Sequence, residues 1–471
     1  MKRREFMKFG LAAAVGSVAA GSVYGESGKR VRPNFLFILA DDVTYNTLSC
    51  YGGGNIKTPN IDALASQGMK FTRAYAAMSM CAPFRAELYT GLYPVRSGVA
   101  RNHVGANVGT KSICHYLRDL RYRVGIVGKT HASPRTVFPF DRVGGRDLAG
   151  DSVRQYITKD PKQPFCLFCC SNNAHPPWRS GDASKIDSDK VKLPPVIHDN
   201  PPTRKTFIGY LAEVVELDRE VGSVLKLLKE TGQADNTLVM FSSEQGWDFA
   251  FGKWTNWDIG LRSALTARWP GRIKPGSVSD ALIQIADITP TFIEAAGGDP
   301  KTIGLDGRSF LPVLTGKSRK HRKFVYGVHN NAPEGNPYPI RSLRDEEFHY
   351  IANLKHDQPY HEKHLQNVAL AKRYDLQWWA ATTEAAKNGD KRAKMLMDKF
   401  HNRPAEELYR VDEDPYEMNN LAADPKYADV KKRLRAELDR WMKTQNDPGA
   451  AMDVPIKPKP KRRPARGKSR Q

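Results

Sequence analysis

The 471-residue chain lacks a hydrophobic run that could cross a membrane. The apolar stretch at residues 9–20 falls short of the roughly 20 residues that a spanning helix needs. The chain also lacks an internal repeat, a glycine-rich phosphate loop and a second cysteine pair at zinc-site spacing, which argues against repeat architectures, phosphate-loop enzymes and zinc modules. Three of its six cysteines lie in one apolar run at residues 165–170, a distribution that does not indicate a simple disulfide framework.

Positive charge exceeds negative charge strongly, with 73 Lys and Arg against 51 Asp and Glu, a formal net charge of +22. This balance suggests a polyanionic partner such as nucleic acid, an anionic surface or a sulfated glycan. Eight of the positive charges lie in residues 455–471, where Pro alternates with Lys and Arg and no acid occurs. We expect this segment to be a disordered basic tail, so the remaining chain is less basic than the total implies.

The N-terminus has the pattern of a bacterial export signal. Lys2-Arg3-Arg4-Glu5-Phe6-Met7-Lys8 precedes the apolar stretch, and small residues follow through Gly25. The sequence therefore predicts a twin-arginine signal peptide at residues 1–25, a periplasmic or extracellular protein, the twin-arginine export machinery as a partner and no membrane anchor. Export, together with the absence of a recognised nucleic-acid-binding module, argues against nucleic acid as the partner.

Four continuous apolar runs, at residues 33–40, 122–127, 165–170 and 238–242, alternate with helical stretches such as residues 207–229. Runs of this kind are typical of strands buried on both faces, and the alternation predicts an α/β fold with a large, mostly parallel sheet sandwiched by helices. After Gly316 the chain becomes polar and turn-rich, and its pattern predicts a hairpin at 342–354 and a charged amphipathic helix at 421–442. We expect a catalytic domain at residues 31–316 and a smaller antiparallel-sheet subdomain at 317–450.

Oxygen-bearing side chains follow two of the predicted strands. Asp41 and Asp42 end the first strand, and Glu244 and Gln245 end the strand that begins at Leu238. Ligands of open parallel sheets bind beyond the carboxyl ends of the strands, and such hard oxygen donors suit calcium or magnesium better than zinc. The alternative for Asp41 and Asp42 alone is a helix cap.

The pentapeptide Cys81-Ala82-Pro83-Phe84-Arg85 resembles the sulfatase signature Cys-x-Pro-x-Arg. Further blocks similar to those of sulfatases occur in the family's order from about residue 33 to residue 442. They are residues 58–65, Thr90-Gly91-Leu92-Tyr93-Pro94, Gly128-Lys129-Thr130-His131, Ala174-His175-Pro176, Gly252-Lys253 and residues 407–421. The resemblance implies an alkaline-phosphatase-like fold and a sulfatase activity.

The resemblance also implies a cofactor set and a catalytic set. A maturation enzyme oxidises Cys81 to formylglycine (3-oxoalanine), whose hydrate attacks sulfur, displaces the alcohol or amine and then expels sulfate. One calcium ion per chain is expected to be held by Asp41, Asp42, Cys81, Glu244 and Gln245. The catalytic roles fall to Arg85 and Lys129, which hold the hydrate, to His131 as base, and to His175 and Lys253, which contact the sulfate and assist the leaving group. A divalent cation and cationic side chains supply the preorganised positive field that a sulfate group requires.

Two positions depart from the family pattern. Most sulfatases carry Asp-Asn or Asp-His where this chain has Glu244-Gln245, each one methylene longer. The donor types are retained, so we expect calcium still to bind, with a shifted backbone. Thr130 stands in a block that usually reads Gly-Lys-Trp-His, which alters the pocket wall and keeps both chemical groups.

Within the family the chain is most similar to the N-sulfoglucosamine sulfohydrolase (heparan N-sulfatase) branch, through residues 125–141 and Tyr338-Pro339-Ile340-Arg341-Ser342. This likeness makes His329 and Arg341 candidate substrate contacts and an N-sulfated sugar the first expected substrate. A 6-O- or 2-O-sulfated glycan is the nearest alternative. A phosphatase or phosphodiesterase of the same superfamily would place Ser or Thr at position 81, and a non-catalytic sulfated-glycan binder would not need the catalytic set.

Overall fold

The computed structural model describes residues 32–366 and 377–454. The predicted signal peptide at 1–25 and the basic tail at 455–471 lie outside these residues. The described residues from Pro33 onward form one compact unit. Within the described ranges, no helix combines the length and the apolar character that crossing a membrane requires.

The large sheet has nine strands and is mostly parallel, as the sequence predicts. Its order is β4-β3-β5-β1-β6-β7-β2-β8, with β9 also paired to β2. The central strands β3, β5, β1 and β6 run parallel to one another, whereas β7 is antiparallel to both β6 and β2. The strands are β1 Asn34–Ala40, β2 Met69–Tyr75, β3 Arg123–Gly128, β4 Asp141–Arg142, β5 Phe165–Cys170, β6 Thr237–Ser243, β7 Arg262–Arg268, β8 Ser277–Ser279 and β9 Ile283–Gln284.

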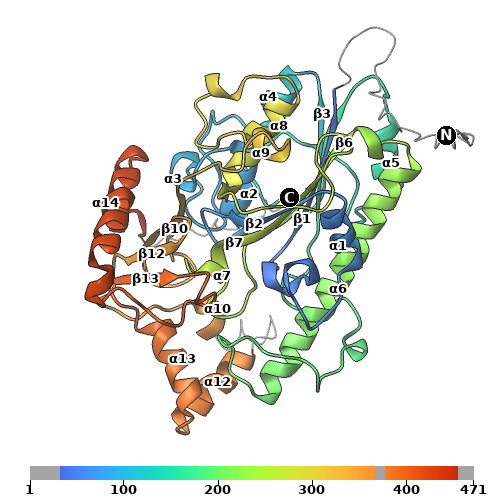
Figure 1. Cartoon of the computed structure of the whole chain (residues 1–471). Helices are drawn as coiled ribbons and strands as arrows, with labels where there is room; N and C mark the ends of the chain where they lie inside the picture. Colours follow the sequence, from blue (N-terminus) through green and yellow to red (C-terminus); the bar gives the residue numbers. More distant parts are fainter. Residues whose placement is uncertain (1–31, 367–376, 455–471) are drawn as a thin grey trace, which may run out of the picture. The chain divides into compact units, whose positions relative to one another are not determined.

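Helices cover both faces of this sheet, which explains why its central strands are continuously apolar. In β1, Leu36 and Ile38 face a core shared with α1 and α6, while Phe35 and Phe37 face a core shared with α2, α4 and α8. Figure 1 shows the long helix α6, in green, alongside the sheet. The helices are α1 Pro59–Ser66, α2 Cys81–Thr90, α3 Pro94–Ser97, α4 Ile113–Asp119, α5 Asp151–Thr158, α6 Pro201–Glu230, α7 Asp258–Leu261, α8 Ile288–Ala295, α9 Leu311–Leu314, α10 Lys363–Gln366, α12 Gln377–Lys387, α13 Lys391–His401 and α14 Ala428–Thr444.

Helix α6 begins six residues before the predicted start at Phe207. Asn200 caps it by accepting a hydrogen bond from the backbone N–H of Thr203 at 2.9 Å. Pro201 and Pro202 occupy the first turn, where a missing N–H costs nothing because that N–H has no partner within the helix. The apolar periodicity starts only after this polar first turn, so it indicates the helix but not its beginning.

A second sheet of four antiparallel strands, β10-β11-β12-β13, confirms the predicted smaller unit. Its strands are Val325–His329, Ile340–Arg344, Phe348–Asn353 and Glu406–Arg410, and β11 and β12 form the predicted hairpin. Helix α14, red in Figure 1, packs on one face through Leu434, Leu438 and Trp441. The other face shares a core with the large sheet, so the domain limits at 31–316 and 317–450 remain predictions.

All six cysteines lie within the described residues and none forms a disulfide; Cys166, Cys169 and Cys170 are buried in β5.

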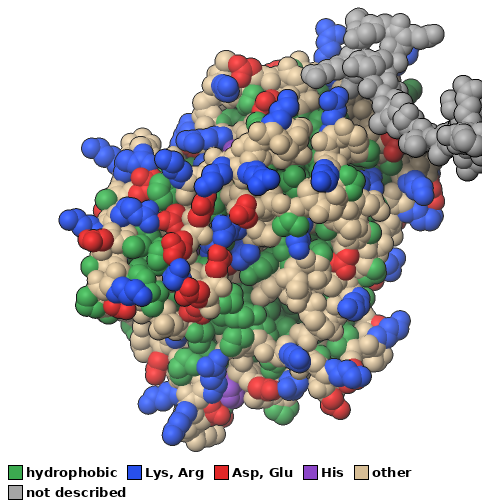
Figure 2. Space-filling model, in the orientation of Figure 1, with side chains coloured by type: hydrophobic (Ala, Val, Ile, Leu, Met, Phe, Trp, Pro, Cys, Tyr) green, Lys and Arg blue, Asp and Glu red, His purple; other side chains and the backbone are tan. Residues whose placement is uncertain are grey.

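Side chains of both charges are mixed at the surface. Figure 2 shows Lys and Arg spread among Asp and Glu over the face displayed, rather than gathered into one basic patch. The described part of the chain therefore does not present, on this face, the uniform positive surface that the overall charge alone suggests.

Candidate active site

The predicted catalytic and metal residues meet at one edge of the large sheet. Strands β3, β5, β1 and β6 are neighbours and parallel, so their carboxyl ends lie side by side. The side chains that follow these four ends are, in sheet order, Lys129 and His131, His175, Asp41 and Asp42, and Glu244 and Gln245. Topology alone therefore brings together residues that are about 200 positions apart.

Cys81 is the first residue of α2, and its side chain is 1% exposed. Its Sγ lies 3.6 Å from Asp41 Oδ1 and 3.9 Å from Asp42 Oδ1, and the amide Nε2 of Gln245 lies 3.9 Å from the same sulfur. The α2 N-terminus thus delivers the cysteine into the group of oxygen donors. This position also favours negative charge on a group held there.

Three buried ion pairs surround the cysteine. Lys253 Nζ lies 2.7 Å from Asp42 Oδ2, Lys129 binds Asp41, and Arg85 binds Glu244. His175 adds a contact of 3.8 Å from Nε2 to Asp42 Oδ2. The three cations thus pair one to one with the three carboxylates, and a bound divalent cation would add positive charge for an anionic substrate.

Burial shifts the proton affinities of this group. It raises the pKa of Asp42 and, more strongly, that of Glu244, and the attraction of Lys253 and Arg85 only partly opposes the rise. Asp41 is equally buried, but Lys129 and His175 outweigh the desolvation and hold its pKa well below the usual range. Burial also raises the pKa of the Cys81 thiol, so an unmodified cysteine here is a protonated thiol rather than a thiolate nucleophile.

The oxygen donors fit a hard divalent cation. Ligand atoms of Asp41, Asp42, Cys81 and Glu244 all lie within 4.8 Å of one another. Gln245 donates a hydrogen bond to Asp42 through Nε2, while its Oε1 is buried and has no hydrogen-bond partner among the described residues. A buried, unpaired amide oxygen beside three carboxylates matches the oxygen ligands that calcium takes. These residues would hold the ion between the ends of β1 and β6.

Local backbone geometry fixes two of the site residues. Gly128 ends β3 with a φ of +79°, and a Cβ at this position would lie 2.0 Å from the backbone oxygen of Cys170. This close approach allows the N–H of Lys129 to donate to that oxygen at 3.0 Å. Asp42 has a φ of 53°, a conformation that side-chain-bearing residues adopt rarely and that is concentrated at functional sites.

The catalytic candidates around Cys81 line a pocket of about 660 Å³. The sequence did not indicate eight of the residues on its wall, because they belong to no recognisable motif: Asn102, His103, Arg146, Asn172, Pro177, Asp248, Trp254 and His364. The other residues lining it are Cys81, Lys129, His131, His175, Pro176 and Lys253. The pocket therefore has both cationic and anionic walls around the cysteine.

The two candidate substrate contacts do not lie on this pocket. His329 and Arg341 are both fully buried. Arg341 pairs through Nε and Nη2 with Asp447, which is also buried, and donates to the backbone oxygen of His329 at 3.0 Å. The placement of these two residues at the substrate was inferred from their position in the smaller unit, and the structure instead places them beneath its surface.

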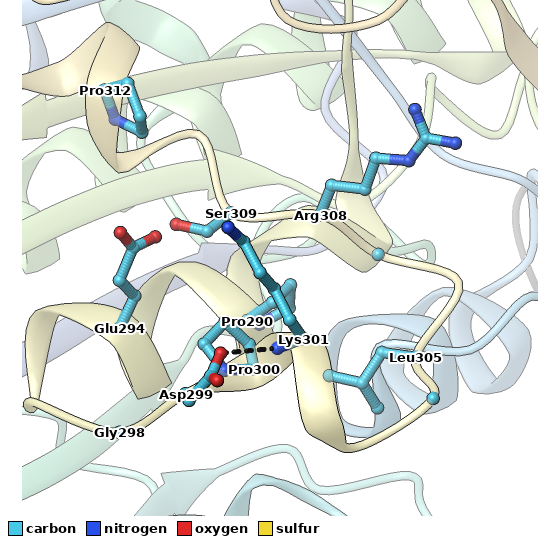
Figure 3. A pocket seen from close by; sticks show the side chains of 12 residues that line it. Pro290, Glu294, Gly298, Asp299, Pro300, Lys301, Leu305, Arg308, Ser309 and Pro312 are labelled. Atoms are coloured by element: carbon cyan, nitrogen blue, oxygen red, sulfur yellow. Dashed lines mark hydrogen bonds between the residues drawn. The ribbon is translucent and has the colours of Figure 1, made fainter.

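A second pocket, of about 620 Å³, lies at α8 and the segment that follows it (Figure 3). Glu294, Asp299, Lys301 and Arg308 are among the residues that line it, and its lining contains neither cysteine nor histidine. The dashed line in Figure 3 is the bond from the Lys301 N–H to Asp299 Oδ1, at 3.0 Å. Among the described residues, the groups that could hold a metal ion lie at Cys81 and not in this pocket, so the pocket at Cys81 is the candidate active site.

Fold and site together define an α/β protein with a buried cysteine among side chains that could hold a metal ion, at the carboxyl edge of its sheet. Comparison with known proteins identifies the family. The sulfatase family model matches residues 33–155 and 147–298, and the model of the N-sulphoglucosamine sulphohydrolase C-terminal region matches residues 243–370. An ulvan-active sulfatase from Formosa agariphila is 36% identical over 432 residues, which cover 88% of this chain and 81% of that protein.

The chain therefore belongs to the sulfatase family, and it is a sulfuric ester hydrolase, as the signature at Cys81 implied. Human N-sulphoglucosamine sulphohydrolase is 28% identical over 473 residues, covering 89% of this chain and 92% of that protein. A solved structure of a protein in complex with its substrate D-glucosamine-2-N,6-O-disulfate superimposes with a TM-score of 0.67 at 20% identity, over 89% of this chain and 99% of that one. This last likeness confirms the fold.

Proposed function

We propose that this sulfatase removes a sulfate group from a sulfated carbohydrate, using Cys81 after its conversion to formylglycine and one calcium ion. The observation that carries the proposal is the placement of Cys81 at the start of α2, within 4 Å of carboxylate oxygens of Asp41 and Asp42 and beside the amide of Gln245. A metal-ligand set that closes around one cysteine is what the sulfatase signature requires. The named substrates of the relatives, ulvan and N-sulphoglucosamine, support a carbohydrate substrate.

The cationic and histidine side chains around Cys81 have different roles in the proposed reaction. Calcium, when bound, supplies positive field to the sulfate oxygens and to the converted Cys81. Lys129 pairs with Asp41 and Arg85 pairs with Glu244, and from these positions the two side chains hold the hydrate of the converted Cys81. His131 acts as the base that removes a proton from the converted residue. His175 and Lys253 line the pocket next to Asp42, where they hold the sulfate and assist the leaving group.

The first expected substrate is an N-sulfated glucosamine at a chain end, and an O-sulfated sugar (6-O or 2-O) is the second candidate. The nucleophile and the metal act on the same sulfur in both cases, so the catalytic group does not separate them. Discrimination depends on the leaving atom, because an amine leaves well only when it is protonated, and on the pocket wall. With His329 and Arg341 buried, sugar contacts fall to the wall residues Arg146, Asp248 and His364.

Export and maturation complete the proposal. The twin-arginine pattern at residues 1–25 predicts transport to the periplasm or outside the cell, after or together with the action of a formylglycine-generating enzyme on Cys81. Replacing Arg3 and Arg4 by Lys should keep the protein in the cytoplasmic fraction. Equal amounts of wild type and variant in the periplasm would contradict this route.

The test of activity is sulfate release from a panel of defined N-sulfated, 6-O-sulfated and 2-O-sulfated saccharides, with phosphate esters included. We expect release from the N-sulfated member and a loss of at least about a thousandfold in Cys81→Ser. Cys50→Ser, a half-buried cysteine away from the pocket, is the matched control and should keep full activity. Sulfate release only from O-sulfated members would show that the substrate is an O-sulfated sugar and would leave the sulfatase assignment intact. Turnover of phosphate esters alone would favour a phosphatase or phosphodiesterase. A protein that binds the saccharides and releases nothing would be a sulfated-glycan binder.

A further inference from the structure

Two histidines from different loops meet at the rim of the active-site pocket. His103 Nδ1 lies 3.1 Å from His131 Nε2, and the two ring centroids are 5.0 Å apart at an interplanar angle of 41°. His131 follows β3, and His103 lies between α3 and α4. Both residues have positive φ, 60° for His103 and 41° for His131. Such conformations are rare for residues that carry a side chain, and they persist only where the surrounding structure fixes them.

This contact determines which nitrogen of His131 can serve the reaction. A neutral imidazole carries one N–H and one lone pair, on different nitrogens. Because Nε2 of His131 is engaged with His103, only Nδ1 remains to face another group. That Nδ1 is buried and has no hydrogen-bond partner among the described residues, although His131 lines the same pocket as Cys81.

The outer nitrogen of His103 has partners for both protonation states. His103 Nε2 lies 3.1 Å from Nδ2 of Asn102, whose Oδ1 is buried and unpaired, so a turn of this amide lets it either donate to Nε2 or accept from it. The side chain of His103 is 61% exposed, which gives the same nitrogen access to water. His131 is thus connected to solvent through one ring.

The buried carboxylate of Glu334 lies near the outer nitrogen of His103. Among the described residues, Glu334 Oε1 has no hydrogen-bond partner and lies 3.9 Å from His103 Nε2, while Oε2 accepts from Lys363 at 2.8 Å and from His364 at 2.9 Å. Burial favours the neutral acid, but these two partners prevail and hold the pKa of Glu334 at about 2. Burial lowers the pKa of His103, and the attraction of Glu334 only partly opposes this, so His103 rests as a neutral imidazole with one nitrogen that can accept a proton and one that can release it.

We propose that His103 is a positioning and proton-relay residue, which holds the ring of His131 and passes to solvent the proton that His131 removes from the reacting group. The inference rests on the proposed function, in which His131 is the base. Nδ1 of His131 takes the proton, the proton on Nε2 of His131 moves to Nδ1 of His103, and the proton on Nε2 of His103 leaves to water. The starting tautomers return when Nδ1 of His131 gives its proton to water in the emptied pocket and one proton comes back through His103.

The test compares His103→Gln with His103→Ala, using His356→Ala as the control because His356 is exposed and does not line the pocket. Glutamine can hold His131 by a hydrogen bond but cannot carry a proton. We expect kcat to fall by roughly 10- to 100-fold in both His103 variants with KM nearly unchanged, and added imidazole to restore part of the rate in His103→Ala only. The His356 variant should keep the wild-type kcat. A His103→Gln enzyme with wild-type kcat would overturn the relay.

A second measurement does not depend on turnover. In protein labelled with ¹⁵N-histidine, an N–H···N bond between His103 and His131 should produce a scalar coupling across the bond that disappears in His103→Gln. Wild-type protein without this coupling would overturn the proposal whatever its activity. Wild-type protein that shows the coupling but releases no sulfate from any substrate would instead refute the proposed function, so the two failures are distinguishable.

Discussion

Removing calcium should lower the thermal stability of the protein by a measurable amount. The proposed ligands lie at the ends of β1 and β6, two central strands of the main sheet, so an ion bound there links the middle of the fold. An ion that binds only the folded state at a thousandfold excess over its Kd stabilises it by about 4 kcal/mol. At roughly 2 cal/mol/K per residue, the unfolding entropy of a chain of this length is roughly 0.9 kcal/mol/K. Dividing the stabilisation by this entropy gives a rise of about 4–5 °C in the unfolding midpoint when calcium is bound.

The assay is a thermal scan of chelator-treated protein with increasing calcium. Asp42→Asn removes one ligand charge and should abolish the calcium-dependent rise. Its starting midpoint will also fall, because Lys253 loses its buried partner, so only the difference with and without calcium is compared. Asp280→Asn, at an exposed carboxylate outside the cluster, is the matched control and should keep the full rise. A wild-type midpoint that does not respond to calcium, or an equal rise in Asp42→Asn, would refute the assignment of these residues as metal ligands.

Three further outcomes follow from the structure and the sequence. Arg341→Met should destabilise the protein by about 3–5 kcal/mol in urea unfolding, because Asp447 would be left as an unpaired buried charge; a stable variant with only a raised KM would restore Arg341 as a substrate contact. Burial favours the neutral form of Glu407, but its partners, chiefly Arg403, hold its pKa at about 2. The ionised Glu407 therefore contributes fully to the free energy of unfolding above about pH 4.5, and this contribution is lost as the pH falls towards 2. This loss of up to about 3 kcal/mol should appear in unfolding free energies measured against pH and be absent from Glu407→Gln. Deleting the chain from Pro455 onward should leave turnover of a small substrate unchanged and slow turnover of a long polyanion at low salt; equal polymer rates would contradict a role for the tail.

The sheet and the centre of the site could be predicted from the sequence because both depend on local patterns. Strand β1 is apolar at every position after Asn34, since it is buried on both faces, and the polar residues that follow it lie at the sheet edge by topology. The boundary of α14 illustrates where such patterns fail. The helix was predicted from residue 421 but begins at Ala428, because Pro425 in the preceding turn disfavours helical geometry at the residue before it.

The pocket wall could not be predicted from the sequence, because it is assembled by long-range packing. His103 and Glu334 lie in two loops and His364 lies in helix α10, and these three segments are far apart in the sequence and share no motif. Arg341 was a candidate substrate contact because its segment resembles one branch of the family, and that role stays a prediction. The sequence could not show that strand β11 directs this side chain into the interior, towards an aspartate 106 positions further along the chain.

Mass spectrometry of active protein purified from its own host tests the central claim most directly. Conversion of Cys81 to formylglycine should lower the mass of its peptide by about 18 Da relative to the thiol. The peptide that contains Cys114, a buried cysteine away from the pocket lining, is the internal control and should retain its thiol. The account predicts that sulfate release rises in proportion to the converted fraction of Cys81. Fully active enzyme in which Cys81 is entirely an unmodified thiol would contradict it.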